Sequence, residues 1–468
     1  MTFLTEKNTS AAKAAAAATP HVQAHARRRA RLAEKLKRGI VVLPTAPEKI
    51  RNADTHHGYR FDSHFFYLTG FREPEAVLVI VAGKKPKSLL FCREKNLERE
   101  IWDGHRYGPE AARKAFAMDA TYPIEALDEV LPRLLQDQPA LFTPLGLDKE
   151  WDQRVVAWLN GVRALARSGV SAPTEIRDVR DAVSAMRLIK DAAEVALMRR
   201  AAAISTAAHK RAMRAAKGAR FEYEIEAELL HEFKRHGSQA PAYGSIIAAG
   251  ANACVLHYVE NNGPMQKGDL MLIDAGCEFD GYASDITRTF PISGKFSGPQ
   301  KDVYELVLDS QFAAIKAVKP GASFIAYHEA AVKVLAQGMI DLKLCKGSRD
   351  KVIETEDYRR FYMHRTGHWL GLDVHDAGAY MHDGKWVKLE PGMVLTVEPG
   401  MYIRPAENVP KAFWNIGVRI EDDVLVTKKG RDVLTEDCPK KVADIEALMA
   451  GSLMQNSMGP RRVLHQAA

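Results

Sequence analysis

The sequence predicts two globular domains, a smaller α/β domain followed by a larger α+β domain. Over roughly the first 180 of 468 residues, short apolar runs alternate with helical patterns, which is typical of an α/β domain. Beyond that point helical patterns come first and most strand patterns come later, which favours helices packed on an antiparallel sheet. We assign a disordered tail, the α/β domain, the α+β domain and a C-terminal tail to residues 1–22, 23–180, 181–450 and 451–468.

Short apolar runs and two amphipathic stretches define the elements expected in the first domain. The expected strands are GIVVLP, AVLVIV and SLLFC, at residues 39–44, 76–81 and 88–92. The expected helices are AHARRRARLAEKLKRG and ALDEVLPRLLQD, at residues 24–39 and 126–137. The Ala-rich, low-complexity composition that precedes them predicts disorder at the N-terminus.

Long helical patterns open the second domain, and strand patterns follow. One apolar stripe recurs at helical spacing through Ile189, Ala193, Leu197, Ile204, Ala208 and Ala212. Gly218 is expected to end that helix. Three more helices are expected at residues 221–237, 301–318 and 324–339. Strands are expected at residues 244–251, 270–276, 281–290, 393–403 and 417–427.

Composition and charge argue against several classes of protein. The net charge of +7 is a mild excess for this length, so we expect a solvated basic surface and no nucleic-acid binding through residues 27–37. No apolar segment is long enough to cross a bilayer, so no membrane partner is expected. Five scattered cysteines without a CxxC pair favour a reducing, cytoplasmic location. The Ala- and Arg-rich N-terminus leaves a transit peptide as an alternative.

The segment IDAGCEFDGYASD has the pattern of a β-hairpin with an acid in each arm. If its Asp-Gly dipeptide forms a two-residue turn, counting back places Gly276 opposite Asp285. Asp274 then shares a face with Asp285, at a diagonal distance of about 7–8 Å between backbones. Two carboxylates converging on a half-buried sheet repel each other, and one or two divalent cations would relieve that repulsion.

The last third of the chain offers the further ligands that a two-metal site needs. Glu398 ends the apolar run MVLTVE, and Glu421 shares the polar face of GVRIEDD with Arg419. His368 lies in the segment MHRTGHWLGLDVHD. With the hairpin acids these form an oxygen-rich set without a thiolate, which favours Mn²⁺, with Co²⁺ or Zn²⁺ as alternatives.

Each of these residues also has a purely structural interpretation. A single strand Asp is usually a turn or edge residue, and Glu398 alone would suit a turn cap. Arg419 and Glu421 would suit a surface ion pair. His257, in VLHYVE, would suit a hydrogen-bonded core position. Three histidines lie in one short segment and are interleaved with glycines: His364, His368 and His375. Packing alone explains this group less well than it explains the single residues above.

The blocks that contain these residues resemble one family. Four of them are similar to the signature blocks of aminopeptidase P, the Xaa-Pro aminopeptidase branch of the pita-bread metallopeptidases: LIDAGCEFDGYASDITRTFP, HWLGLDVHDAG, LEPGMVLTVEPGMYI and GVRIEDDVLVT. The N-terminal domain of that branch resembles YRFDSHFFYLTGFREPEAVLVIV. The likeness runs from about residue 25 to about residue 450. It implies an α/β N-terminal domain followed by an α+β pita-bread catalytic domain with a curved antiparallel sheet.

The resemblance implies two metal ions and a role for each ligand. Asp274 would hold one metal in bidentate fashion, with the free amino group of the peptide nearby. Asp285 and Glu421 would bridge both metals. His368 and Glu398 would complete the shell of the other metal. A hydroxide bridging the metals would attack the bond before proline, and Glu398 would pass the proton of that water to the proline nitrogen.

The resemblance also implies residues that bind and orient the peptide. His257 and His375 would stabilise the tetrahedral intermediate or orient the substrate. His364 and Arg419 would line the proline side of the cleft and steady the bridging Glu. The amide before proline is tertiary and crowded, so many proteases cleave it poorly. The resemblance implies that the substrates are peptides with proline in second position.

The N-terminal domain would limit access to the cleft within a homodimer or homotetramer, with Asp54 and Trp102 contributing from that domain. One residue departs from the family pattern. Arg365 stands where the family commonly has a small residue, which would change either the backbone beside His364 or the leaving-group subsite. We expect intact metal ligation and an altered preference beyond proline. Two alternatives stay open: a prolidase restricted to Xaa-Pro dipeptides, and a non-catalytic pita-bread module that binds peptides.

Overall fold

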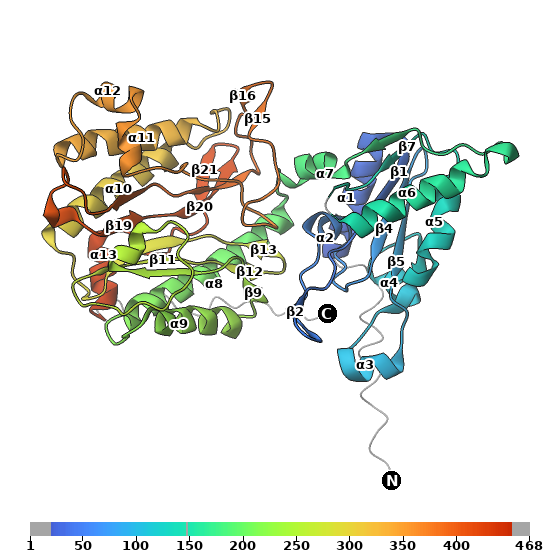
Figure 1. Cartoon of the computed structure of the whole chain (residues 1–468), viewed down its shortest axis with the longest axis horizontal. Coiled ribbons are helices and arrows are strands. Elements are labelled where there is room, and N and C mark those ends of the chain that lie inside the picture. Colours follow the sequence, from blue (N-terminus) through green and yellow to red (C-terminus); the bar gives the residue numbers. More distant parts are fainter. Residues whose placement is uncertain (1–19, 147, 452–468) are drawn as a thin grey trace, which may run out of the picture. The chain divides into compact units, whose positions relative to one another are not determined.

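The computed structural model describes residues 20–146 and 148–451, and the chain divides into two compact units between Met186 and Arg187 (Figure 1). The tails predicted at residues 1–22 and 451–468 lie outside the described residues, except at their inner ends. At the N-terminal end the first helix already begins at Pro20, which is earlier than predicted.

A six-stranded mixed sheet forms the centre of the N-terminal unit, in the order β6-β5-β4-β1-β7-β8. Its strands are β1 (Gly39–Pro44), β4 (Val77–Ala82), β5 (Lys87–Cys92), β6 (Ala120–Pro123), β7 (Ala140–Phe142) and β8 (Glu175–Arg177). The central strand β4 is antiparallel to β1 and β5, and the outer pairs are parallel. The three predicted strands are β1, β4 and β5. The others span only three or four residues, too few to show a hydrophobic period.

Helices and one exposed hairpin complete this unit. The helices are α1 (Pro20–Leu36), α2 (Ser63–Thr69), α3 (Leu97–Asp103), α4 (Gly108–Ala115), α5 (Leu127–Leu135), α6 (Lys149–Arg163) and α7 (Val179–Arg187). The hairpin consists of β2 (Ile50–Asn52) and β3 (Thr55–His56), and all of its side chains are exposed.

Two arginines of the basic run in α1 serve packing. Arg28 and Arg29 are buried, and Arg29 donates hydrogen bonds to the carbonyls of Leu68 at 2.9 Å and Ala117 at 2.7 Å. Guanidinium groups that donate to backbone carbonyls inside the fold cannot also bind the phosphates of a nucleic acid. The burial of these two arginines therefore weakens the nucleic-acid reading of the basic run.

Helices form one layer of the second unit. They are α8 (Ala192–Ala215), α9 (Glu222–Arg235), α10 (Gly298–Ala317), α11 (Ala326–Asp341), α12 (Arg349–Glu354) and α13 (Val442–Met449). The long helices pack in pairs, α8 with α9 and α10 with α11 (Figure 1). Within the described ranges, no helix combines the length and the apolar composition that crossing a bilayer requires.

The apolar stripe predicted for α8 is correct in its second half only. Asp191 caps the helix and forms a capping box with Glu194, so Ile189 precedes the helix. Leu197 is only partly buried. The buried side follows Met198, Ala201, Ser205, Ala208 and Ala212.

Antiparallel strands form the other layer. They are β9 (Ala240–Pro241), β10 (Ile246–Ala249), β11 (Leu270–Asp274), β12 (Cys277–Phe279), β13 (Tyr282–Ala283), β14 (Thr287–Pro291), β15 (Met381–His382), β16 (Lys385–Trp386), β17 (Val394–Val397), β18 (Gly400–Ile403), β19 (Ile416–Arg419), β20 (Asp422–Thr427) and β21 (Gly430–Val433). Every pairing among them is antiparallel, as predicted. One face packs on the helices: Ile273 and Val418 join the core of α8 to α11. Asp274 and Arg419 follow these residues and therefore face the opposite side.

The strands predicted as continuous are interrupted where the acidic residues lie. The stretch predicted at residues 281–290 splits into β13 and β14 around Asp285. The stretch at 393–403 splits between β17 and β18 at Glu398, and the stretch at 417–427 splits between β19 and β20 at Glu421. Three candidate ligands thus lie where the strand pairing is interrupted. Such an interruption changes the direction in which a side chain points.

A buried histidine beneath the hairpin gives this unit a pH-dependent stability. His209 of α8 is fully buried, and its Nε2 lies 2.9 Å from the carbonyl of Ala275. Burial lowers the pKa of His209 to about 4. Because the unfolded chain takes up this proton near pH 6.5 and the folded chain does not, the stabilising effect is complete above pH 6.5 and declines on acidification towards pH 4.

We expect the free energy of unfolding of the metal-free protein to fall when the pH is lowered from 7 to 4. In wild type this fall should exceed the fall in His209→Gln by up to about 3 kcal/mol. Gln retains a hydrogen-bond donor without the titration. Urea unfolding at several pH values measures the difference, and His382→Gln on the exposed β15 serves as control. Parallel pH profiles for wild type and His209→Gln would contradict the assignment.

Candidate metal centre

The hairpin has the register that the sequence predicts. Phe279 pairs with Tyr282 beside the turn. Asp274 pairs with Thr287 at the far end. The two pairings belong to one continuous register, so Asp285 lies diagonally from Asp274 on the same face.

A glycine lets the two arms approach each other at the acids. A Cβ atom on Gly276 would lie 1.7 Å from the carbonyl oxygen of Ser284, so no larger residue fits there. The hydroxyl of Tyr243 then lies 2.6 Å from Asp274 Oδ1 and 2.5 Å from Asp285 Oδ1. The two carboxylates therefore converge on a single atom.

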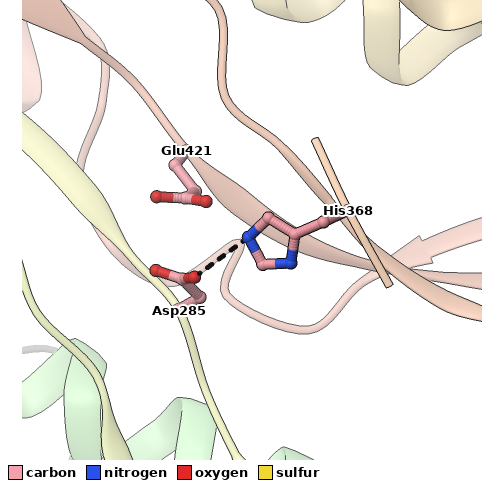
Figure 2. Close-up of side chains that lie close together, drawn as sticks. All are labelled: Asp285, His368 and Glu421. Carbon is pink, nitrogen blue, oxygen red and sulfur yellow. Dashed lines mark ion pairs between the residues drawn. The ribbon is translucent and has the colours of Figure 1, made fainter. Parts of the chain in front are cut away.

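The remaining predicted ligands meet the hairpin acids in one place. Asp285, His368 and Glu421 each offer a ligand atom, and these atoms lie within 4.8 Å of one another (Figure 2). His368 Nε2 is 3.5 Å from Asp285 Oδ2 and 3.7 Å from Glu398 Oε1. A cavity of about 440 Å³ is lined by all five predicted ligands, Asp274, Asp285, His368, Glu398 and Glu421.

Backbone pairing fixes the positions of His368 and Glu398. The segment before His368 runs beside β17, where Glu398 N–H donates to Thr366 O at 2.8 Å and Thr396 N–H donates to His368 O at 2.9 Å. A Cβ atom on Gly367 would lie 2.0 Å from Thr396 O, so only glycine permits this pairing. The Thr396 hydroxyl donates to Glu398 Oε1 at 3.4 Å.

The centre holds more negative charge than its own cations balance. Burial raises the pKa of Glu421 well above its ordinary value and that of Glu398 to about 7. Burial also raises the pKa of Asp274, although Arg419 opposes this effect from 2.6 Å. Arg419 and Glu421 are buried, so the interpretation of these two residues as a surface ion pair is wrong.

His368 presents one nitrogen to the carboxylates. Its Nδ1 lies 3.0 Å from the carbonyl of Trp369, which can only accept, so Nδ1 carries a proton and Nε2 faces Asp285 and Glu398. Burial would lower the pKa of His368, but the two carboxylates raise it to about 9. Burial would raise the pKa of Asp285, but His368 lowers it. One imidazole nitrogen and four clustered carboxylates are a donor set that fits two divalent cations.

A chain of hydrogen bonds leads from the centre to His364. Arg419, paired with Asp274, donates to the Tyr402 hydroxyl at 3.0 Å. That hydroxyl lies 2.9 Å from His364 Nε2, and His364 Nδ1 lies 2.7 Å from the carbonyl of Arg365. Burial lowers the pKa of His364 to about 3. The ring is therefore neutral: it donates from Nδ1 to the carbonyl and accepts the Tyr402 proton at Nε2.

The structure brings two other predicted histidines to the same cavity. His257 and His375 both line it with exposed side chains, so a core position for His257 is wrong. The His375 ring lies 4.3 Å from that of His368, edge to face. Asp54 and Trp102 belong to the N-terminal unit, where both are exposed, and their roles remain predictions.

Sequence reasoning missed the groups that hold the ligands. These groups include Tyr243, the hydroxyl of Thr287, which donates to Glu421 Oε2 at 2.6 Å, and Asp423. The Asp423 carboxylate accepts the backbone N–H of Asp285 at 3.2 Å. Thr287 and Asp423 could have been predicted from the sequence. Each lies two positions after a candidate ligand, Asp285 or Glu421, and side chains two positions apart in a strand point to the same face. Tyr243 could not, because it lies in an irregular stretch before β10.

A helix-backed antiparallel sheet that presents clustered carboxylates and a histidine to a cavity is typical of a metal-dependent hydrolase. Residues 196–428 match metallopeptidase family M24, and residues 25–142 match the aminopeptidase P N-terminal domain. The chain belongs to the aminopeptidase P branch of this family and is a metal-dependent aminopeptidase. The predicted α/β domain followed by a pita-bread domain is confirmed by these matches and by solved relatives.

Relatives cover nearly the whole chain. A Xaa-Pro aminopeptidase from Haemophilus influenzae is 44% identical over 92% of this chain and 97% of its own length. The solved aminopeptidase PepP of Pseudomonas aeruginosa is 49% identical with a TM-score of 0.90, over 92% of this chain and 98% of that chain. A zinc-substituted Escherichia coli aminopeptidase P in complex with product is 42% identical with a TM-score of 0.89, over 93% and 99%.

Proposed function

We propose that this enzyme hydrolyses the bond between an N-terminal residue and a following proline in peptides of three or more residues. The observation that carries the proposal is one cavity that is lined by all five candidate ligands together with His257, His364, His375 and Arg419. The Xaa-Pro activity named for the Haemophilus influenzae relative supports the same substrate class.

We propose that the centre would hold two divalent cations. Asp274 would be a ligand of one, His368 and Glu398 would be ligands of the other, and Asp285 and Glu421 would be ligands of both. The oxygen-rich donor set favours Mn²⁺, with Co²⁺ or Zn²⁺ as alternatives. Such cations, when bound, lower the pKa of a coordinated water and polarise the scissile carbonyl.

The protein side chains supply proton transfer and orientation. Glu398 is proposed to take the proton of the attacking water and deliver it to the proline nitrogen, which has no proton of its own. His257 and His375 are proposed to donate to the developing oxyanion, because both are accessible from the cavity. The neutral His364, held through Tyr402 by Arg419, is proposed to line the proline side.

A pair of peptides tests the activity and separates it from prolidase. With Mn²⁺ added, we expect cleavage of an Xaa-Pro-Yaa tripeptide at the first bond. Mass spectrometry of the released residue measures this cleavage. An Xaa-Pro dipeptide is the comparison substrate, and Xaa-Ala-Yaa is the control for the proline requirement. Cleavage of the dipeptide alone would establish prolidase instead.

Metal content separates the enzyme from a non-catalytic peptide-binding module. After loading with Mn²⁺ and removal of free ion, we expect about two ions per chain by mass spectrometry of the metal. Fewer than one ion per chain would favour the binding module.

We propose that the protein is a cytoplasmic homodimer or homotetramer. Helix α3 supports an assembly, because Leu97, Ile101 and Trp102 are between 72% and 80% exposed there. Asp54 and Trp102 are proposed to contact substrate in that assembly. All five cysteines are unpaired and buried, which suits a reducing compartment and no disulfide. Light scattering that gives the mass of a single chain would refute the assembly.

A further inference from the structure

Two arginines line the cavity of the metal centre, and their situations differ. Arg419 is buried and ion-paired with Asp274 at 2.6 Å, so its charge is already used. Arg365 is exposed, and in the described part of the chain no acidic side chain pairs with it. Of the two arginines that line the cavity, Arg365 is therefore the one whose charge remains available to a ligand.

The guanidinium of Arg365 has a fixed place. Its central carbon lies 4.8 Å from the centre of the Trp386 ring, within the range of a cation–π contact. Trp386 is partly buried and stacks on Phe324 at 6.1 Å, in the core beneath β17 and β20. The backbone of Arg365 is held as well, because its carbonyl accepts from His364. A side chain fixed at both ends loses little entropy when it binds a ligand.

Arg365 lies on the Glu398 side of the centre. It follows His364, whose Nδ1 is 4.0 Å from Glu398 Oε2. The charge of Arg365 also acts on the hydroxyl of Tyr380, as does that of Glu398. Arg365 is next to His364 in the chain and lines the same cavity, so it is the cation nearest in sequence to the side proposed above for the proline.

We propose that Arg365 is a specificity-determining residue that binds a carboxylate on the leaving-group side of the peptide. This inference rests on the proposed function and deepens it. The planar guanidinium fork, with its ring contact on one face, is suited to two parallel hydrogen bonds to a carboxylate. That carboxylate is either the chain terminus of an Xaa-Pro-Yaa tripeptide or the side chain of an acidic third residue. The cavity volume of about 440 Å³ suits a ligand of this size.

The test compares a tripeptide Xaa-Pro-Ala as free acid and as C-terminal amide, together with amidated Xaa-Pro-Asp and Xaa-Pro-Asn. We expect wild type to favour the carboxylate member of at least one pair by about tenfold in kcat/KM, mostly through KM. The pair that shows the preference identifies the source of the carboxylate. Arg365→Gln should reduce that ratio to about one and leave the rate on the neutral member within about twofold. Arg365→Lys should retain part of the preference.

A matched control is Arg359→Gln, an exposed arginine of the same stretch that pairs with Glu356 outside this cavity. This variant should keep the wild-type ratio. The proposal is overturned if wild type shows no carboxylate preference in either pair, a result that needs no variant. It is also overturned if Arg365→Gln slows carboxylate and neutral peptides equally, because that outcome indicates packing on Trp386. Failure of wild type to cleave any Xaa-Pro peptide would instead refute the proposed function.

Discussion

Glu398→Gln is expected to leave the fold intact and to lower turnover of an Xaa-Pro-Yaa peptide by at least about two orders of magnitude. Gln fills the same volume and keeps the oxygen that accepts from Thr396 at 3.4 Å, so the packing between β17 and β18 is retained. It loses the ability to take a proton, and it removes one negative charge from the donor set. Both losses act directly on the reaction.

Metal content measured beside activity separates these two effects. If Glu398→Gln still binds about two Mn²⁺ ions and is inactive, proton transfer is the missing function. If it binds about one, loss of a ligand explains the result. The exposed Glu390, on the same segment but outside the cavity, provides the control variant Glu390→Gln with unchanged activity. Near-normal turnover by a fully loaded Glu398→Gln would contradict the role assigned to Glu398.

The hairpin shows how much of the site local rules can predict. Asp280 and Gly281 both have positive φ, 51° and 85°, as an Asp-Gly turn of two residues requires. Counting across that turn was enough to place Asp274 and Asp285 on one face, because each step in a ladder alternates the side chain. The alternation of Val418 and Ile420 with Arg419 and Glu421 likewise predicted that Arg419 and Glu421 share the polar face.

Long-range contacts could not be predicted in this way. Nothing in the local pattern shows that His368 lies 3.5 Å from Asp285, more than eighty residues earlier. The need for further metal ligands suggested that the two segments meet, and the resemblance to a family gave His368 its role. The strand breaks at Asp285 and Glu421 have no comparable local signal, whereas Pro399 and Gly400 mark the break after Glu398. Tyr243 contacts the hairpin acids from an irregular stretch beside β11, and the local sequence pattern gives no signal for that contact.

Arg288→Met is expected to produce the largest loss of stability, about 3–5 kcal/mol, because it leaves a buried carboxylate partly unpaired. Arg288 lies on β14 and is fully buried. Its guanidinium donates to Asp422 Oδ1 at 2.7 Å and to the carbonyls of Glu421 at 2.5 Å and Cys438 at 2.9 Å. In the variant Asp422 keeps Lys440 at 2.6 Å as its remaining cation.

This change should also reach the metal centre, because the carbonyl that Arg288 holds belongs to the candidate bridging ligand Glu421. We therefore expect weaker Mn²⁺ binding and a lower midpoint for the unfolding of the catalytic unit. Circular dichroism measures the unfolding, and metal analysis of the same samples measures the bound Mn²⁺. Arg133→Met is the matched control, since Arg133 pairs with Glu129 on the exposed face of α5 and should change neither property. If Arg288→Met unfolded like wild type, the ion pair with Asp422 would be energetically neutral. The position of Glu421 would then depend on Thr287 and the strand ladder alone.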